Sequence, residues 1–388
     1  MIDWYYDRLP GDKFTHALQH LREQGDVVRV SALGGAMPVY YILSHQALAQ
    51  AFRDGDKFPP GHAYQIISLP FIGETFMSMD EDRHRLWRPP MTPSFRRHVI
   101  DEMDIDKLAN IGHDILNSLA GKNKTELVSN FTRLFAFRVI CNQLGLPVAQ
   151  EREYYQWSMD LMFGGRNLAK SQLADSQLTG MVKPVLEARR QHPEDDQISR
   201  WLQTSVDGAA ISDDAILAHI RLFFTAGATT TSDAMSNLFH ALLSHPQAWE
   251  QCVAEPHSQL QAIEELLRWN PPVAAQPRFA RPDADVELAG TCIPANSAVL
   301  FGIAAANRDP LVFSNPGCFD INRNSKTLLS FGPGLRTCPG MHLARKNLQC
   351  ALRIVAERFP GLRLDQGQAS LPEGILLRGT PSLPVNWN

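Results

Sequence analysis

The sequence predicts a mainly α-helical protein with a small β part. From about residue 82 to 270 the pattern is mostly helical, whereas short strand-like runs lie near the two ends of the chain. The 388 residues, 44% of them hydrophobic, can bury a core large enough to enclose a bulky ligand. No internal repeat or Ser/Gly linker divides the chain, so we expect one domain over residues 1–388.

The first elements are two expected strands, at residues 27–30 and 39–43, around a Gly34-Gly35 turn. The clearest helix begins after Ser212, a good N-cap with acidic residues in the following turn, and ends near Ser244, before Pro246. About 32 residues give a helix roughly 48 Å long. Because its middle is hydrophobic on most sides, we expect it to be central and buried.

A second helix is expected at residues 258–269, ending before two prolines, and short strands and turns follow to about residue 308. An irregular segment, 308–330, leads to a Gly-rich loop. Pro339 suits the first turn of a further helix with an apolar face. Strands and turns are expected from residue 362 onwards.

Composition excludes several function classes. A formal net charge of −4 argues against general nucleic-acid binding. The N-terminus has no basic start followed by an apolar run, and no stretch approaches ~18 consecutive apolar residues. We therefore expect a cytoplasmic protein without a membrane anchor. The six cysteines lack paired spacing, so most are expected to be reduced packing residues.

Cys338 is the exception, because it lies in the loop Phe-Gly-Pro-Gly-Leu-Arg-Thr-Cys-Pro-Gly at 331–340. The glycines and proline make a tight loop, and Cys338 precedes a helix N-terminus, whose N–H groups favour a thiolate. Such a thiolate is a strong axial ligand for haem iron. One alternative is a free loop cysteine. Another is half of a zinc site with His342, for which no second pair of ligands is in sight.

The loop resembles the cytochrome P450 signature F-G-x-G-x-[H/R]-x-C-x-G at every fixed position. The resemblance implies a single triangular P450 domain around a buried haem b (iron protoporphyrin IX), with Cys338 as the iron ligand. Phe331 and Gly340 would then be haem-binding loop residues.

Two further motifs resemble the same family in the same order. Glu265-Leu-Leu-Arg268 is similar to its E-x-x-R pair, which implies a buried structural role with Arg323 as a third member. The segment 226–231, Ala-Gly-Ala-Thr-Thr-Thr, resembles A-G-x-[D/E]-T-[T/S] in the central helix. The resemblance implies that Ala226 and Gly227 lie beside the haem and that Thr230 helps to deliver protons.

This chain departs from the family at the usual acidic position, where it has Thr229. A hydroxyl cannot relay a proton by ionising as a carboxylate can. Thr229 and Thr230 are the catalytic candidates, and we expect the proton supply here to differ from that of relatives with an acid at this position. Asp233 follows Thr230 by one helical turn. The haem propionates, by resemblance, would bind His84, Arg88, Arg278 and Arg336, in agreement with the need of buried carboxylates for charged partners.

The resemblance implies monooxygenation, with O2, two electrons and two protons, of a hydrophobic small molecule in secondary metabolism. The expected substrate pocket is largely apolar and comprises Leu222, Phe223, Ala226, Val273, Ala274 and Ile375. Electrons would come from a ferredoxin and its reductase, and we expect a monomer. A basic surface for an acidic ferredoxin would comprise Arg83, Arg85, Arg96, Arg97, Arg345 and Lys346.

Two alternatives to this function remain. One is a haem-thiolate enzyme that catalyses peroxide-driven oxidation or oxidative phenol coupling, which is suggested by Thr229 in place of the usual acid. The other is a non-enzymatic haem-thiolate sensor, against which the retained Thr230 and the substrate-facing helix argue.

Overall fold

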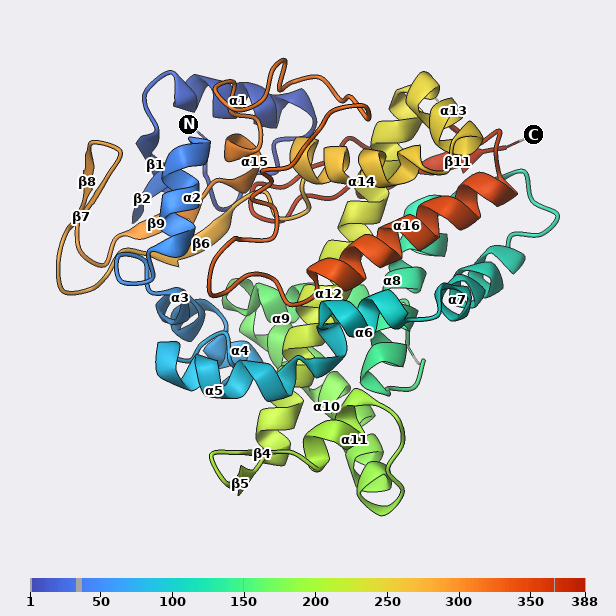
Figure 1. Cartoon of the computed structure of the whole chain (residues 1–388), viewed down its shortest axis with the longest axis horizontal. Helices are drawn as coiled ribbons and strands as arrows, with labels where there is room; N and C mark the ends of the chain where they lie inside the picture. Colours follow the sequence, from blue (N-terminus) through green and yellow to red (C-terminus); the bar gives the residue numbers. More distant parts are fainter. Residues whose placement is uncertain (1, 33–36, 149, 366, 388) are drawn as a thin grey trace.

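A computed structural model describes residues 2–32, 37–148, 150–365 and 367–387. The Gly34-Gly35 turn therefore lies outside the described residues. A four-stranded sheet and its small helices lie on one side of the molecule, and the long helices fill the other, with both termini along the same edge (Figure 1). No helix among the described residues combines the length and apolarity that a membrane span requires.

The helices before the central one are α1 (Asp12–Arg22), α2 (His45–Arg53), α3 (Pro60–Ile67), α4 (Leu69–Ile72), α5 (Glu81–Met91), α6 (Arg97–Glu102), α7 (Ile105–Asn117), α8 (Arg133–Leu144), α9 (Tyr154–Met162), α10 (Leu168–Gln191) and α11 (Gln197–Leu202). Of these helices, α4, α8, α9 and α10 pack against the central one, and several others contribute to the cavity lining. Short non-α turns occupy Pro93–Phe95, Val128–Thr132 and Gly164–Arg166.

The central helix α12 (Asp213–Ser244) has 32 residues, and the Ser212 side chain caps it by accepting a hydrogen bond from the Ala215 N–H. The sequence-based prediction of this helix is confirmed at both ends. It packs against α8, α9 and α16, and most of its residues are buried. The helices that follow are α13 (Pro246–Ala254), α14 (Ser258–Trp269), α15 (Ile303–Ala306) and α16 (Met341–Arg358).

The last helix begins two residues later than expected. Gly340 is the N-cap of α16, so Pro339 precedes the helix rather than occupying its first turn. The Gly340 carbonyl accepts the first bond of the helix, from Ala344 N at 2.8 Å. Pro339 thus closes the loop rather than starting the helix.

The main sheet has the order β1-β2-β9-β6 and comprises β1 (Val27–Ala32), β2 (Met37–Ile42), β9 (Ala298–Phe301) and β6 (Gln276–Phe279). β2 and β9 are parallel, and the other two pairings are antiparallel. Alternate residues face two core clusters: Val28 and Tyr41 belong to one, Val27 and Ile42 to the other. This register fixes β6 beside the cavity.

The remaining strands are short. They are β3 (Lys124–Glu126), β10 (Arg363–Leu364) and β11 (Pro384–Asn386) in one sheet, and the hairpins β4 (Ser205–Val206) with β5 (Ala209–Ala210) and β7 (Val286–Leu288) with β8 (Thr291–Ile293). The mainly α architecture with a small β part is as the sequence predicted.

Candidate active site

A cavity of about 600 Å³ lies between α12, the α3–α4 segment, β6 and the loop that carries Cys338. Most of its lining is apolar, and no Asp or Glu is among the lining residues. Its polar members include Cys338, Thr230 and Arg278. The cavity therefore suits a bulky, mostly apolar ligand with a few fixed polar contacts.

The Cys338 loop owes its shape to glycine. Gly332 and Gly334 have φ of 62° and 125°, and a Cβ on Gly334 would lie 2.7 Å from the Phe52 carbonyl oxygen. The Cys338 N–H donates to the Phe331 carbonyl at 2.9 Å, which closes the loop. The Cys338 side chain is accessible from the cavity that it lines, and the Phe331 ring lies beside it under the Arg345 guanidinium.

The electrostatics of this sulfur differ from what the helix N-terminus alone predicts. Burial raises the pKa of the Cys338 thiol, and this outweighs the lowering by the Gly340 N–H, Arg88 and Arg345. The helix end was expected to favour the thiolate. The Gly340 N–H does lower the pKa of the thiol, but the combined effect of all groups is to raise it, so the expectation is wrong overall. Loss of hydration in a largely apolar cavity opposes the charged form.

The threonines of α12 lie on different sides of the helix. Thr230 lines the cavity and donates its hydroxyl proton to the Ala226 carbonyl at 2.6 Å. Thr229 is fully buried, donates to the Thr225 carbonyl at 2.5 Å, and is not among the lining residues. Consecutive helix residues point about 100° apart, so the two hydroxyls of the motif face different surroundings.

Ala226 and Gly227 line the cavity beside Thr230. A Cβ on Gly227 would lie 3.2 Å from the Ile140 side chain on α8, so glycine here lets α8 and α12 approach each other. Both residues line the cavity into which Cys338 opens.

Three of the four predicted propionate contacts lie together. Arg336 donates to the carbonyls of Phe76 at 2.8 Å and Met79 at 2.8 Å, and Arg88 donates to the Leu335 carbonyl at 3.0 Å and to the Thr337 carbonyl. Burial, followed by the charges of Arg336, Arg88 and Arg85, lowers the pKa of His84 to about 3. This cluster therefore combines cationic groups with a neutral imidazole.

Arg278 comes from β6 and is 4% exposed. Its guanidinium lies 5.1 Å from the Tyr64 ring centroid and 5.6 Å from that of Phe301, and it donates to its neighbouring Pro277 carbonyl at 2.9 Å. No carboxylate among the described residues forms an ion pair with it. A buried guanidinium without such a partner is suited to an anionic ligand.

Tyr64 and Gln276 lie 212 positions apart yet meet in the cavity wall, a contact that the sequence did not predict. Gln276 Nε2 donates to Tyr64 Oη at 2.7 Å, which leaves the Tyr64 hydroxyl proton for another acceptor. Only the folded chain brings α3 against β6, so this pair could not be found from local patterns.

The chain's residues fit the haem that the cysteine loop implies. Both ring nitrogens of His84 and the Nε of Arg336 are buried without a hydrogen-bond partner among the described residues. Unsatisfied buried nitrogens of this kind, next to the guanidinium groups of Arg88 and Arg336, suit the carboxylates of a porphyrin. Cys338 would hold the iron from the cavity wall. No cluster of three or more His, Cys, Asp or Glu side chains in the described part of the chain could hold another metal, which argues against a zinc site at Cys338 and His342.

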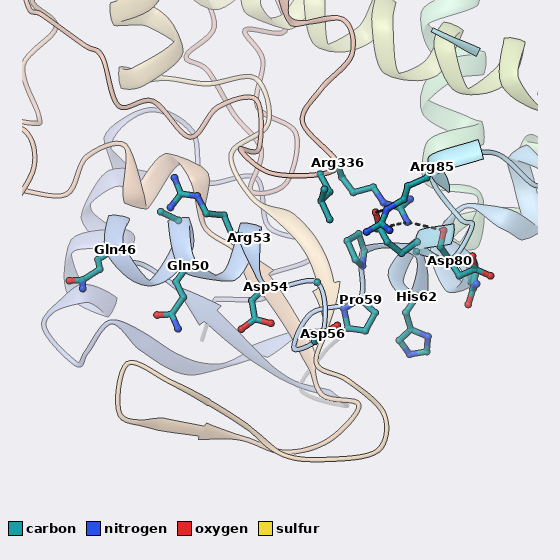
Figure 2. A pocket seen from close by; sticks show the side chains of 17 residues that line it. Gln46, Gln50, Arg53, Asp54, Asp56, Pro59, His62, Asp80, Arg85 and Arg336 are labelled. Atoms are coloured by element: carbon teal, nitrogen blue, oxygen red, sulfur yellow. Dashed lines mark hydrogen bonds and ion pairs between the residues drawn. The ribbon is translucent and has the colours of Figure 1, made fainter. Parts of the chain in front are cut away.

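A second, polar cleft of about 910 Å³ opens next to this cluster. Figure 2 shows Arg336 and Arg85 together at one end of the cleft, where both form ion pairs with Glu81, at 3.7 Å and 3.3 Å. Asp54 and Asp56 line its middle. Arg336 and Pro60 belong to the linings of both the cleft and the apolar cavity, so they form the wall between them.

Four of the six predicted pocket residues line the cavity, and two do not. Leu222, Phe223, Ala226 and Val273 line the cavity, but Ala274 and Ile375 do not. Ala274 and Ile375 are buried in a core cluster with Leu376, and their neighbours Ala275, Leu376 and Leu377 line the cavity instead. Val273 and Ala275 line the cavity on either side of Ala274, because adjacent side chains of an extended segment point to opposite sides.

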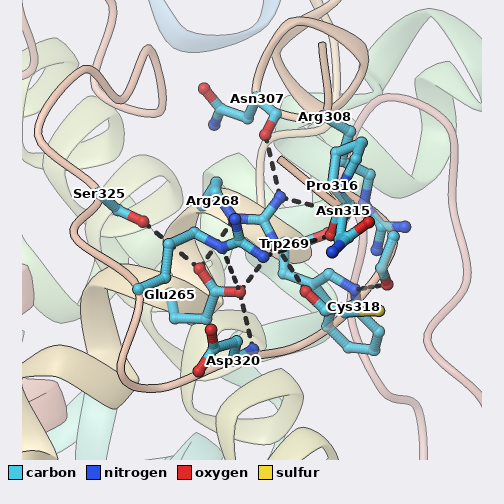
Figure 3. A network of polar contacts seen from close by, with 12 residues as sticks. Glu265, Arg268, Trp269, Asn307, Arg308, Asn315, Pro316, Cys318, Asp320 and Ser325 are labelled. Atoms are coloured by element: carbon cyan, nitrogen blue, oxygen red, sulfur yellow. Dashed lines mark hydrogen bonds and ion pairs between the residues drawn. The ribbon is translucent and has the colours of Figure 1, made fainter. Parts of the chain in front are cut away.

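Glu265 and Arg268 form a fully buried bidentate ion pair on α14, at 2.7 Å and 2.8 Å. Arg268 also donates to the carbonyls of Asn307, Pro316 and Cys318 (Figure 3). Arg323 Nε donates to the Glu265 carboxylate at 3.3 Å. The pair therefore ties α14 to the irregular segment before the cysteine loop, and the structure places Arg323 in this network.

The comparisons with known proteins agree with this geometry. The family model "Cytochrome P450" matches residues 148–382. Cytochrome P450 CYP107DY1 of Priestia megaterium is 31% identical over 80% of this chain and 76% of its own. The 6-deoxyerythronolide B hydroxylase of Saccharopolyspora erythraea is 29% identical over 99% of this chain and 96% of its own.

Among solved structures, cytochrome P450 CYP109Q5 of Chondromyces apiculatus is 26% identical, with a TM-score of 0.85 over 96% of this chain and 95% of its own. Family model, relatives and fold agree with the loop that presents Cys338 to the cavity. The chain therefore belongs to the cytochrome P450 family of haem-thiolate monooxygenases.

Proposed function

We propose that this P450 oxidises a hydrophobic small molecule of secondary metabolism with electrons from a separate ferredoxin and its reductase. The observation that carries the proposal is that Cys338 and Thr230 line the same cavity, whose other walls are mainly apolar. Relatives named for mycinamicin IV and for 6-deoxyerythronolide B support a natural-product substrate.

The bound haem supplies the activation of O2. The chain's own residues then have distinct tasks. Cys338 would hold the iron, and His84, Arg88, Arg278 and Arg336 would bind the propionates. Thr230 holds a hydroxyl group at the cavity wall, and the apolar side chains of Leu222 and Phe223 exclude water and orient the substrate.

The surface for the electron donor is less basic than the sequence predicted. Arg83 pairs with Glu74 at 2.6 Å, Arg97 with Asp101 at 3.3 Å, and Arg345 with Glu264 at 2.5 Å. Lys346 donates to backbone carbonyls at the end of α6. The predicted surface also includes the exposed Arg96, and Leu86 and Leu335 are exposed on α5 and the cysteine loop. We propose a ferredoxin contact at this face in which apolar burial complements a reduced positive charge.

The test is turnover under ¹⁸O2 with ferredoxin, ferredoxin reductase and NADPH. Candidate substrates are first selected by the shift that they cause in the ferric Soret band. We expect a product that carries one ¹⁸O atom, with one NADPH consumed per product. A product without the label, or no oxidation of any compound that shifts the band, would contradict the proposal.

A peroxide-driven oxidation is the second candidate, and the burial of Thr229 away from the cavity favours it. Turnover with H2O2 alone that exceeds turnover with ferredoxin and NADPH would support this candidate. The reverse order would support the first one.

A further inference from the structure

The middle of α12 carries a buried carboxyl group near the threonine pair. Among the residues of α12, Asp213, Asp214 and Asp233 are acidic, and the first two lie in its first turn. Asp233 follows Thr230 by three residues and Thr229 by four. Side chains at these two spacings are neighbours on a helix surface, with about 5–6 Å between Cβ atoms. Asp233 is 8% exposed and therefore lies within the protein.

The surroundings of Asp233 leave most of its hydrogen-bonding capacity unused. Tyr155 Oη on α9 donates to Oδ1 at 3.3 Å, and the Arg133 guanidinium of α8 lies 4.1 Å from the Tyr155 ring centroid. The backbone of Gly379 packs on the carboxyl, since a Cβ there would lie 2.5 Å from Oδ1. A structural carboxylate at such burial normally has several short, charge-assisted bonds, as Glu265 has.

The groups around Asp233 determine the pKa of its carboxyl group and so its ability to exchange a proton. Burial raises the pKa of Asp233 to about 7, and the charge of Arg133 and the Tyr155 hydroxyl oppose this rise. Burial also raises the pKa of the neighbouring Tyr154, which stays neutral. Both forms of the Asp233 carboxyl are therefore populated at neutral pH.

We propose that Asp233 supplies protons to the cavity through the Thr230 hydroxyl, one helical turn beyond the position where the family motif has its acid. This rests on the proposed monooxygenase function. Thr230 donates its own proton to the Ala226 carbonyl, so its oxygen lone pairs can accept one. A single water that bridges carboxyl and hydroxyl would complete this path. Asp233 acts through Thr230, so it is a positioning residue of the proton supply.

The proton balance is closed. Each turnover converts substrate, O2, two electrons and two protons into hydroxylated product and one water. Protonated Asp233 gives its proton towards Thr230, which passes one on into the cavity. The Asp233 carboxylate regains a proton from solvent by way of Tyr155, whose side chain is partly exposed. Oxidation driven by H2O2 consumes no added proton, because the peroxide supplies both hydrogens of the water released.

The experiment measures kcat, KM and coupling for Asp233→Asn with ferredoxin, reductase, NADPH and O2 across about pH 6 to 9. We expect kcat to fall by at least about tenfold, which is less than the full contribution that a general acid typically makes. We also expect a larger share of the NADPH to be oxidised without formation of product. KM stays unchanged because Asp233 does not line the cavity. The wild-type kcat falls as pH rises through about 7, and the variant lacks this inflection.

Two variants control for structural damage. Asp214→Asn alters an exposed acid of the same helix and leaves kcat unchanged. The double variant Asp233→Asn, Thr229→Asp places a carboxyl at the family's usual position and restores much of kcat. The H2O2-driven rate of Asp233→Asn stays close to that of the wild type.

An equal loss of the NADPH-driven and H2O2-driven rates, without rescue by Thr229→Asp, would mean a structural role and would overturn the proposal. An unchanged kcat and pH profile in Asp233→Asn would overturn it as well. If the wild type itself fails with ferredoxin and NADPH, the proposed function fails instead, so the two failures are distinguishable.

Discussion

At the scale of single residues, Cys338 shows how a local pattern can identify a ligand but not its ionisation. The Gly-rich loop and the following helix were evident in the sequence, and both are present in the structure. The net electrostatics depend on the apolar walls that α12 and the α3–α4 segment bring from elsewhere in the chain. The sulfur's environment therefore favours the thiol until a metal ion is bound.

Replacement of Cys338 tests this role directly. Cys338→Ala removes the sulfur ligand, so the reduced, CO-bound protein should lose the strongly red-shifted Soret band of thiolate-bound haem. Cys318→Ala alters an exposed free cysteine and should leave the spectrum unchanged. An unaltered spectrum in Cys338→Ala would exclude this sulfur as the ligand.

The contacts of Tyr64 with Gln276 and Arg278 could not be predicted from the sequence. Tyr64→Phe removes the hydroxyl that meets Gln276 and lies beside Arg278. We expect haem to leave this variant for an acceptor protein about tenfold faster, the equivalent of ~1.4 kcal/mol, as for one lost hydrogen bond to a charged group. The control is Tyr6→Phe, which alters an exposed tyrosine (53% exposed). Equal rates in Tyr64→Phe and wild type would place the hydroxyl away from the porphyrin carboxylates.

At the scale of elements, α14 and the segment 307–325 depend on one buried ion pair. Arg268→Ala leaves Glu265 charged and buried without its main partner, which costs about 3–5 kcal/mol of unfolding free energy. Urea unfolding of the haem-bound protein measures the loss. Arg281→Ala removes a pair that is exposed to solvent, with Asp283, and should have no measurable effect. A small loss in Arg268→Ala would show that solvent enters and solvates Glu265.

At the scale of the whole molecule, elements with their signals in one stretch of sequence were predicted well. The Ser212 cap and the following apolar run located α12, and the prolines after Trp269 located the end of α14. Predictions failed where the surroundings of a residue come from segments distant in the sequence. Glu264 neutralises Arg345 from another helix, and the direction of the segment before β6 determines that Ala275 rather than Ala274 faces the cavity.

The wall formed by Arg336 has a kinetic consequence. Its guanidinium binds carbonyls of residues more than 250 positions earlier in the chain, and it separates the apolar interior from the polar cleft at the surface. A porphyrin that enters from this side has to break the hydrogen bonds of Arg336 to Phe76 and Met79 first. Uptake of haemin by folded apoprotein would then be gated, with a rate that levels off at high haemin concentration because opening, rather than encounter, becomes limiting.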